Sequence, residues 1–274
     1  MKKLREFCGP LEKIDGKLKM RIGEFVMAKD AMERDWDIRA KHDAIQYVAD
    51  KYRGEAFFEE GTKQAYRFCS SFFKKEGFQP EGKRMLDIGC GIGRMERGFS
   101  KMFGEVWGLD VSGEMVAQAI ELNKAVKNVK FVKGNGQDLD VFPDQYFDFV
   151  FSYITFQHIP EKQMVLNYFS EIHRVLKPDG LFKVLLRQQW AGVAFAFGFI
   201  PIPRFILPHI PDLMWTVYEQ LACRGEKKLY RGKTWRGSGV SENEAKQALL
   251  RLQFKVVEIE EDPSKVTFWC YGRK

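Results

Sequence analysis

The sequence predicts a doubly wound α/β fold. Its mostly parallel seven-stranded sheet has an antiparallel last strand, and N-terminal helices and an inserted lid complete the fold. Two observations support this prediction. Short apolar runs alternate with amphipathic stretches over residues 83–186, as in strands joined by crossover helices. The alternation returns over residues 237–274, whereas residues 187–236 interrupt it with Gly, Pro and aromatic residues.

The expected strands are short and bounded by polar or turn residues. They lie at 84–88, 106–110, 129–133, 147–151, 181–186, 254–260 and 266–271. The last two are joined by Glu-Asp-Pro-Ser, and so short a joint permits only an antiparallel hairpin. Apolar residues at helical spacing follow Pro160 and stop before Pro178, and Ser241 with Glu244 forms a capping box before another helix.

The domain organisation follows from these elements. With 274 residues, the chain can bury a full core. We expect an N-terminal helical cap over 1–80, a core formed by 81–186 and 237–274, and an inserted lid over 187–236.

Composition narrows the class of protein. The first ten residues carry basic side chains without an apolar run behind them, so we expect no secretory signal. Five scattered cysteines without a CxxC pair argue against disulfides or a metal site and fit a reducing cytoplasm. The formal net charge is +7, and between Arg187 and Arg236 eight Lys or Arg residues face three acids. This excess indicates either a solvated basic surface or a site for an anionic partner.

The strongest local signal is Met-Leu-Asp-Ile-Gly-Cys-Gly-Ile-Gly-Arg, residues 85–94. A strand enters a turn with Gly89, Gly91 and Gly93, where the backbone can take positive φ and approach a ligand closely. Dinucleotide-binding loops favour GxGxxG, but Arg94 holds the position of the last glycine of that pattern. The spacing therefore disfavours NAD.

With the pattern Asp-x-Gly-x-Gly-x-Gly, the chain resembles the class I S-adenosylmethionine-dependent methyltransferases. Phe-Asp-Phe-Val-Phe-Ser and Glu-Ile-His-Arg-Val-Leu-Lys-Pro-Asp-Gly extend the resemblance. It covers 83–186 well and 237–274 in outline. The resemblance implies a Rossmann-like core, S-adenosylmethionine as cofactor and S-adenosylhomocysteine as product.

The same resemblance assigns the glycine loop to the aminoacyl part of the cofactor. It implies contacts from Gly89, Cys90, Gly91 and Gly93, with Asp87 organising the loop and the amino end of the cofactor.

The acid that ends the second strand is expected beside the ribose. Asp110 can accept hydrogen bonds from both ribose hydroxyls, and Val111 follows it. The alternative is that Asp110 caps the helix expected after Ser112.

The adenine contact is less defined. The family often has an acid and a small residue after the third strand, where this chain has Asn135 and Gly136. Asn135, Gln137 or Asp138 could make the contact, and Ser152 at the end of the fourth strand completes the predicted site.

Methyl transfer is an in-line displacement that depends mainly on positioning, and a base is needed only when the acceptor must lose a proton. His158 is the candidate base, with stabilisation of its turn as the alternative. Tyr153 is a candidate contact to acceptor or cofactor. Relatives with a helix before the core use an aromatic residue and an Arg to close over the cofactor, which suggests Trp36 and Arg39 here; helix packing is the alternative.

The insertion 187–236 overhangs the ligand edge of the predicted sheet and carries an apolar aromatic stretch and a basic run. We expect it to bind a small-molecule acceptor with an aromatic or lipid-like part and an anionic group. Peripheral membrane contact is a further expectation, whereas nucleic acid is disfavoured because no RNA-binding module is recognisable. Methylation of a membrane lipid or RNA, and a non-catalytic regulatory subunit that binds S-adenosylmethionine, stay open, as does the oligomeric state.

Overall fold

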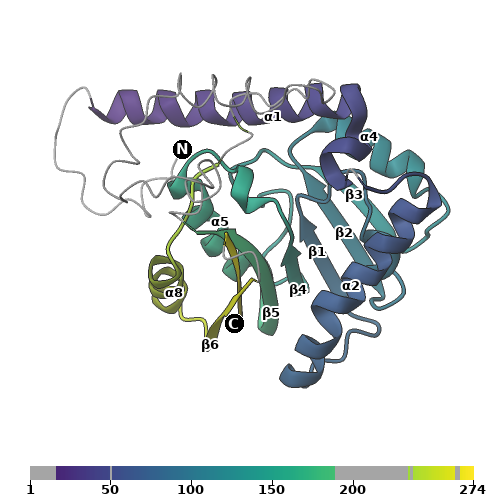
Figure 1. The fold of residues 1–274 in the computed structure, drawn as a ribbon. Helices are drawn as coiled ribbons and strands as arrows, with labels where there is room; N and C mark the ends of the chain where they lie inside the picture. The colour runs from purple at the N-terminus through teal and green to yellow at the C-terminus, as the bar shows by residue number, and fades with distance from the viewer. Residues whose placement is uncertain (1–16, 50, 189–233, 235–236, 263–265) are drawn as a thin grey trace, which may run out of the picture.

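The computed structural model describes residues 17–49, 51–188, 234, 237–262 and 266–274 (Figure 1). They form one seven-stranded sheet in the order β3-β2-β1-β4-β5-β7-β6. All neighbouring strands are parallel except β7, which is antiparallel to both β5 and β6. The strands are β1 (Arg84–Ile88), β2 (Glu105–Asp110), β3 (Val129–Lys133), β4 (Phe147–Ser152), β5 (Leu176–Arg187), β6 (Val256–Glu261) and β7 (Thr267–Arg273). The predicted sheet is confirmed, including its antiparallel last strand.

The helices alternate with the strands, as the sequence predicts. Helix α5 ends just ahead of Pro178, and Ser241 caps α8 in a reciprocal capping box with Glu244. The strand β5 begins earlier than expected, because Leu176 already pairs with β4 before a register shift. The helices are α1 (Lys17–Ala49), α2 (Glu55–Glu76), α3 (Glu96–Phe99), α4 (Gly113–Leu122), η2 (Phe156–His158), α5 (Lys162–Val175) and α8 (Glu242–Arg251).

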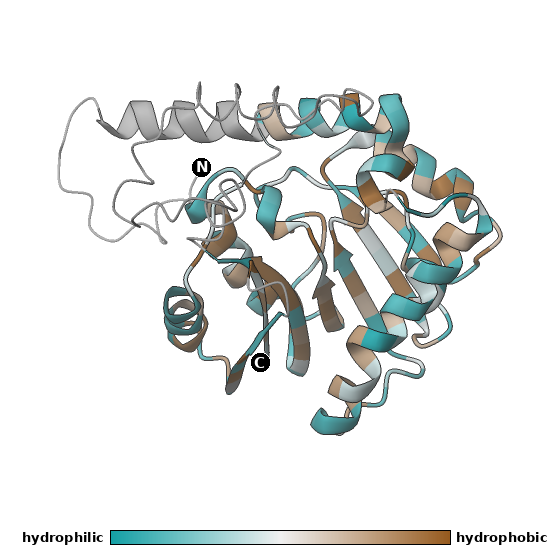
Figure 2. Cartoon of the chain, in the orientation of Figure 1, coloured by the Kyte–Doolittle hydropathy of each residue, from teal (hydrophilic) through white to brown (hydrophobic). Residues whose placement is uncertain are grey.

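The two faces of the sheet are covered by different helices. Residues of β1 alternate between them: Leu86 and Ile88 pack with α5 and α8, whereas Met85 packs with α2. Figure 2 shows apolar strands in the middle of the molecule and polar outer surfaces on helices such as α2 and α8. Since side chains alternate along a strand, Asp87 shares the face of Met85 and lies on the side of α2.

Helix α1 crosses the carboxyl edge of the sheet, at the top of Figure 1. It is divided at Asp43, whose φ and ψ of −170° and 88° are not helical. The side chain of Asp43 accepts a hydrogen bond from the backbone N–H of Gln46 at 3.0 Å, as an N-cap does for a new helix. This helix therefore lies above the edge where ligands bind in parallel α/β sheets.

The two described ends of the insertion lie together at this same edge. Gln188 and Val240 form a parallel bridge, and the N–H of Gly237 donates to the carbonyl of Gln157 at 2.8 Å. Most of the predicted lid lies outside the described residues, so the division of the chain into cap, core and lid stays a prediction. Within the described ranges, none of the helices combines the length and apolar character needed to cross a membrane.

Candidate functional site

A cavity opens at the carboxyl edge of the sheet, between the ends of β1, β2 and β4 and the overlying helix α1. Most residues predicted from the sequence line it. They are Asp87, Gly89, Cys90, Gly91, Asp110, Val111, Gly136, Tyr153 and His158. The structure therefore brings together segments that are far apart in the chain.

The glycine loop forms the floor of this cavity with backbone in the left-handed region. Gly89 and Gly91 have φ of 79° and 56°. A Cβ atom on Gly89 would lie 2.1 Å from Oγ1 of Thr155, so a side chain cannot fit there. The turn thus brings backbone within reach of a ligand, which is the function predicted for these glycines.

Asp110 holds this loop and keeps further acceptor capacity. Its Oδ2 accepts from the N–H of Gly91 and its Oδ1 from the N–H of Ser112, both at 2.9 Å. Each carboxylate oxygen can accept a second hydrogen bond, so the group can receive two vicinal hydroxyls. Burial raises the pKa of Asp110 to about 6. The capping alternative is wrong, because the N-cap of α4 is Ser112, whose hydroxyl accepts from the N–H of Met115.

Two further charged side chains line the cavity without a full set of partners. Asp87 is 4% exposed, and no described residue donates to its Oδ1. Arg94 is 5% exposed; its Nη2 donates to Gln64 at 2.6 Å, whereas Nε and Nη1 contact no acceptor among the described residues. Burial lowers the pKa of Arg94 and raises that of Asp87. Buried charges without partners are costly, so the pair fits a ligand with one ammonium and one carboxylate.

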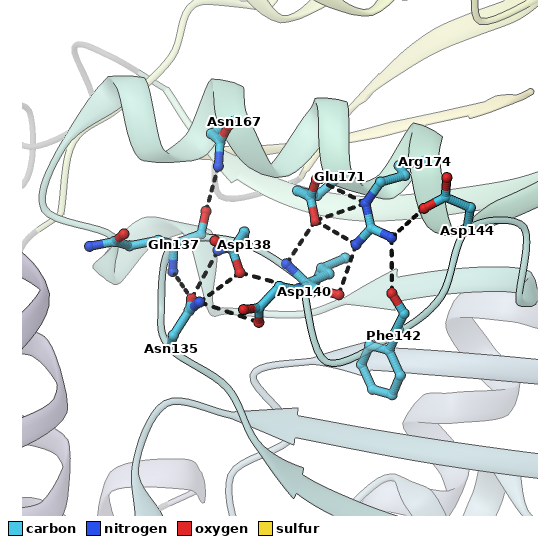
Figure 3. Close-up of polar contacts among 10 residues, drawn as sticks. Asn135, Gln137, Asp138, Asp140, Phe142, Asp144, Asn167, Glu171 and Arg174 are labelled. Atoms are coloured by element: carbon cyan, nitrogen blue, oxygen red, sulfur yellow. Dashed lines mark hydrogen bonds and ion pairs between the residues drawn. The ribbon is translucent and has the colours of Figure 1, made fainter. Parts of the chain in front are cut away.

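The loop after β3 is built differently, because its own side chains hold it (Figure 3). The Oδ1 of Asn135 accepts from the N–H groups of Gln137 and Asp138 at 2.8 and 3.1 Å, and its Nδ2 donates to Asp138 at 2.6 Å. Arg174 of α5 braces the loop through the carbonyls of Leu139 and Phe142. The side-chain amide of Asn135 therefore stabilises the turn in which it lies.

Gly136 is the member of this loop that lines the cavity. Its φ is 74°, and a Cβ atom there would lie 2.6 Å from the side chain of Met32 in α1. Asn135 and Gln137 do not line the cavity, so the structure brings only the backbone of this predicted segment to it.

Three other predicted contacts lie outside the cavity lining and have structural surroundings. A Cβ atom on Gly93 would lie 2.4 Å from Nδ2 of Asn123, and the hydroxyl of Ser152 donates to the carbonyl of Ile88 at 2.7 Å. Arg39 is fully buried; its guanidinium lies over the ring of Trp36 at 4.4 Å. Arg39 therefore does not line the cavity itself but packs against Trp36, which does.

The two candidate catalytic residues line the cavity in different surroundings. Nε2 of His158 lies 3.1 Å from the amide nitrogen of Gln157, and the ring meets Trp36 edge-on at 5.1 Å. Tyr153 stacks on Trp269 with ring centroids 5.8 Å apart, and burial raises its pKa.

Other residues of the cavity were not predicted from the sequence. Met32, Tyr47 and Val48 come from α1, and Arg94 follows the glycine turn. Arg94 had a visible signal, because it stands where the dinucleotide-binding pattern has a glycine. Met32 and Val48 have none, since apolar residues of a helix look alike wherever they pack.

Comparison with known proteins agrees with this geometry. The family model described as "Methyltransferase domain" matches residues 86–184. The demethylmenaquinone methyltransferase of Staphylococcus carnosus is 30% identical over 188 residues, which are 66% of this chain and 73% of that protein. The corresponding enzyme of Geobacillus kaustophilus is 34% identical over 145 residues, 51% of this chain, and the match spans only 60% of its length.

A solved structure extends the agreement to the fold. The magnesium protoporphyrin IX methyltransferase of Synechocystis PCC 6803, solved with bound S-adenosylhomocysteine, aligns with a TM-score of 0.58. It covers 90% of this chain and 99% of that structure at 13% identity, which supports the fold alone.

Proposed function

This chain belongs to the class I S-adenosylmethionine-dependent methyltransferases, and we propose that it methylates a small molecule with an aromatic or lipid-like part and an anionic group. The cofactor of the family is S-adenosylmethionine, as the resemblance implies. The acceptor has to lie beyond the cofactor, at the open side of the cavity.

The residues present fit this cofactor. S-Adenosylmethionine has one carboxylate and one ammonium at its aminoacyl end and two vicinal hydroxyls on its ribose. The Nε and Nη1 of Arg94 and the Oδ1 of Asp87 would hold the first two groups, since no described residue satisfies these atoms. Asp110 would receive the hydroxyls, and the backbone at Gly136 leaves room for a flat base. When bound, the cofactor supplies the electrophilic methyl group.

The proposed class of acceptor rests on one observation, a group of aromatic side chains that extends from the cavity. Tyr153 lines the cavity and contacts Phe68 and Trp269, with ring centroids 4.7 and 5.8 Å apart. Aromatic side chains of this kind bind flat or apolar groups. The guanidinium of Arg67, which pairs with Glu60 at 3.2 Å, lies beside these side chains, 5.5 Å from the centre of the Phe68 ring. Two relatives are named as methyltransferases of demethylmenaquinone, which supports the aromatic and lipid-like part of this acceptor class.

In this proposal, His158 is the base that accepts the proton lost by the methyl acceptor. Tyr153 stays protonated at neutral pH, because burial raises its pKa, and it can therefore donate a hydrogen bond to an acceptor oxygen. The alternatives of a lipid or RNA substrate, and of a regulatory protein that only binds the cofactor, are separate outcomes of the test.

The test measures release of S-adenosylhomocysteine with a short-chain demethylmenaquinol, a phenolic carboxylate, a sterol and a hairpin RNA. We expect turnover with one of the first two. Tyr153→Ala should lower kcat/KM for that acceptor at least roughly tenfold, the scale of one lost aromatic contact, with cofactor affinity little changed. Tyr66→Ala on the exposed side of α2 is the matched control. Turnover with RNA alone, or cofactor binding without turnover on any acceptor, would contradict the proposal.

A further inference from the structure

A second buried acid lies next to Asp87, behind the residues that line the cofactor cavity. Glu96, the first residue of α3, is fully buried, and its carboxylate oxygens meet no donor of ordinary hydrogen-bond geometry among the described residues, although the backbone N–H groups of Glu96 and Met95 lie close enough to favour its ionised form. Its carboxyl group lies within hydrogen-bonding reach of Asp87. Two ionised carboxylates cannot bond to each other, because neither has a donor. A hydrogen bond between them therefore requires one shared proton.

The surroundings of this pair are more acidic than basic. Asp110 of β2 raises the pKa of Asp87 through its charge, and Arg94 is the cation that lowers it. Burial raises the pKa of Glu96 to about 7. When every acid is ionised, three carboxylates face this one guanidinium.

Neutral and more distant groups complete these surroundings. The thiols of Cys69 in α2 and of Cys90 in the glycine loop both have a pKa raised by burial, so they stay neutral. The charge of Lys183 in β5 lowers the pKa of Cys69, and Tyr153 after β4 raises the pKa of Arg94; both effects are smaller than that of burial. No three His, Cys, Asp or Glu side chains of the described ranges are placed to hold a metal ion, so the acids are not explained in that way.

We propose that Glu96 is a positioning residue that shares a proton with Asp87 in the free protein, and that binding of S-adenosylmethionine releases this proton. The inference rests on the proposed function only in its cofactor. S-Adenosylmethionine combines a sulfonium, an ammonium and a carboxylate and so has one net positive charge. That charge replaces the proton as the counter-charge of the acidic pair, so that Glu96 and Asp87 are then both ionised.

The inference also distinguishes cofactor from product. Methyl transfer turns the sulfonium into a neutral thioether, so S-adenosylhomocysteine has no net charge. The acidic pair then regains a proton from solvent, and its attraction for the bound product falls. Product release thus becomes easier relative to substrate binding, by an amount that grows with pH.

Titration calorimetry in phosphate, HEPES and Tris tests this directly, because the three buffers differ in their heat of protonation. At pH 7 we expect wild-type protein to release roughly half a proton or more on binding S-adenosylmethionine, and clearly less on binding S-adenosylhomocysteine. The association constant for S-adenosylmethionine should rise with pH by up to about tenfold per unit. Glu96→Gln, which keeps a hydrogen bond to Asp87 without a titrating proton, should abolish most of the release.

Asp148→Asn is the matched control, since this half-buried carboxylate pairs with Lys177 near the start of β4, away from the ligand edge. It should release as many protons as wild type. The inference is overturned if wild-type protein releases no proton, if it releases the same number with both ligands, or if Glu96→Gln releases as many as wild type. Should Glu96→Gln fail to fold, the wild-type comparison of the two ligands decides alone. Failure to bind either ligand would instead contradict the cofactor assignment.

Discussion

Two loops at the same edge of the sheet are held in opposite ways. The loop after β1, residues 89–95, and the first residue of α3 that follows it bring the buried charges of Arg94 and Glu96 together with few partners from the protein. The loop after β3, residues 134–144, is held by its own side chains and by Arg174 (Figure 3). Both reach the cavity, but only the first presents unsatisfied charge to it.

The difference shows where the protein leaves interactions for a ligand. Buried polar atoms are almost always hydrogen-bonded, because an unmet group costs free energy. In the loop after β3 that requirement is met within the protein, so the loop contributes shape through Gly136. In the loop after β1 it is not met, so the binding energy of the cofactor should concentrate there and at Asp110.

The largest effect is expected at Asp110, which joins the glycine loop to the ribose position. Asp110→Ala should weaken cofactor binding by about 2–4 kcal/mol, taking each charged hydrogen bond as roughly 1.5–3 kcal/mol and allowing for non-additivity. The fold should survive. Calorimetry with S-adenosylhomocysteine measures the loss.

Asp37→Ala is the matched control for this experiment. Asp37 accepts from the hydroxyl of Ser112 and the N–H of Glu114, so it helps cap α4 without lining the cavity. It should lower stability by about 0.5–2 kcal/mol and leave affinity unchanged. If wild type and Asp110→Ala bind S-adenosylhomocysteine with equal affinity, Asp110 does not contribute to cofactor binding and the prediction is wrong.

The second effect is on stability and pH. The pKa of Glu96 is raised to about 7 in the folded protein, because burial disfavours its charge. A raised pKa stabilises the folded state below the unfolded value near 4.5, and this stabilisation is lost as pH rises toward 7. Glu96→Gln should therefore gain stability relative to wild type between pH 5 and 8, by on the order of 3 kcal/mol for a shift of this size. Urea unfolding of the cofactor-free proteins at several pH values measures it, and parallel pH profiles would disprove it.

The third prediction concerns the support that Arg174 gives to the loop after β3. Arg174 donates to Glu171, Asp144 and two backbone carbonyls, so Arg174→Ala should cost about 2–3 kcal/mol of stability. Cofactor affinity should fall by less than about tenfold, or 1.4 kcal/mol. Arg174→Lys should recover little, since an ammonium cannot replace the planar fork. Urea unfolding and calorimetry on one preparation compare the two losses; a larger loss in affinity than in stability would contradict the contrast between the loops.

The sequence predicts the sheet well because periodicity and turn residues are local signals. The strands at 84–88 and 129–133 have the predicted bounds, and Ser241 is the predicted cap. The loop after β3 shows the limit of this reasoning. Asn135 has the right chemistry for adenine, but the sequence does not show that its amide is engaged in its own turn.

The sequence does contain a signal for Glu96, although the adjacent glycine motif draws attention away from it. Ile92, Met95, Phe99 and Met102 repeat at helical spacing and are buried, and Glu96 falls on the same stripe. An acid on an apolar face indicates a buried charge that needs a partner. The remaining contacts, such as those from α1, depend on how a distant helix packs, which no local pattern specifies.

The last prediction separates the two loops by charge alone. Arg94→Met keeps the length and apolar stem of the side chain and removes the guanidinium. Affinity for S-adenosylhomocysteine should fall by about 1.5–3 kcal/mol, the range for a hydrogen bond to a charged group. Stability should fall at neutral pH, because the substitution removes the cation that faces Asp87 and Glu96 and the hydrogen bond to Gln64. Affinity for 5′-methylthioadenosine, which lacks the carboxylate, should not change. If both ligands lose affinity equally, Arg94 shapes the glycine loop; if neither does, the cofactor carboxylate is held by another residue.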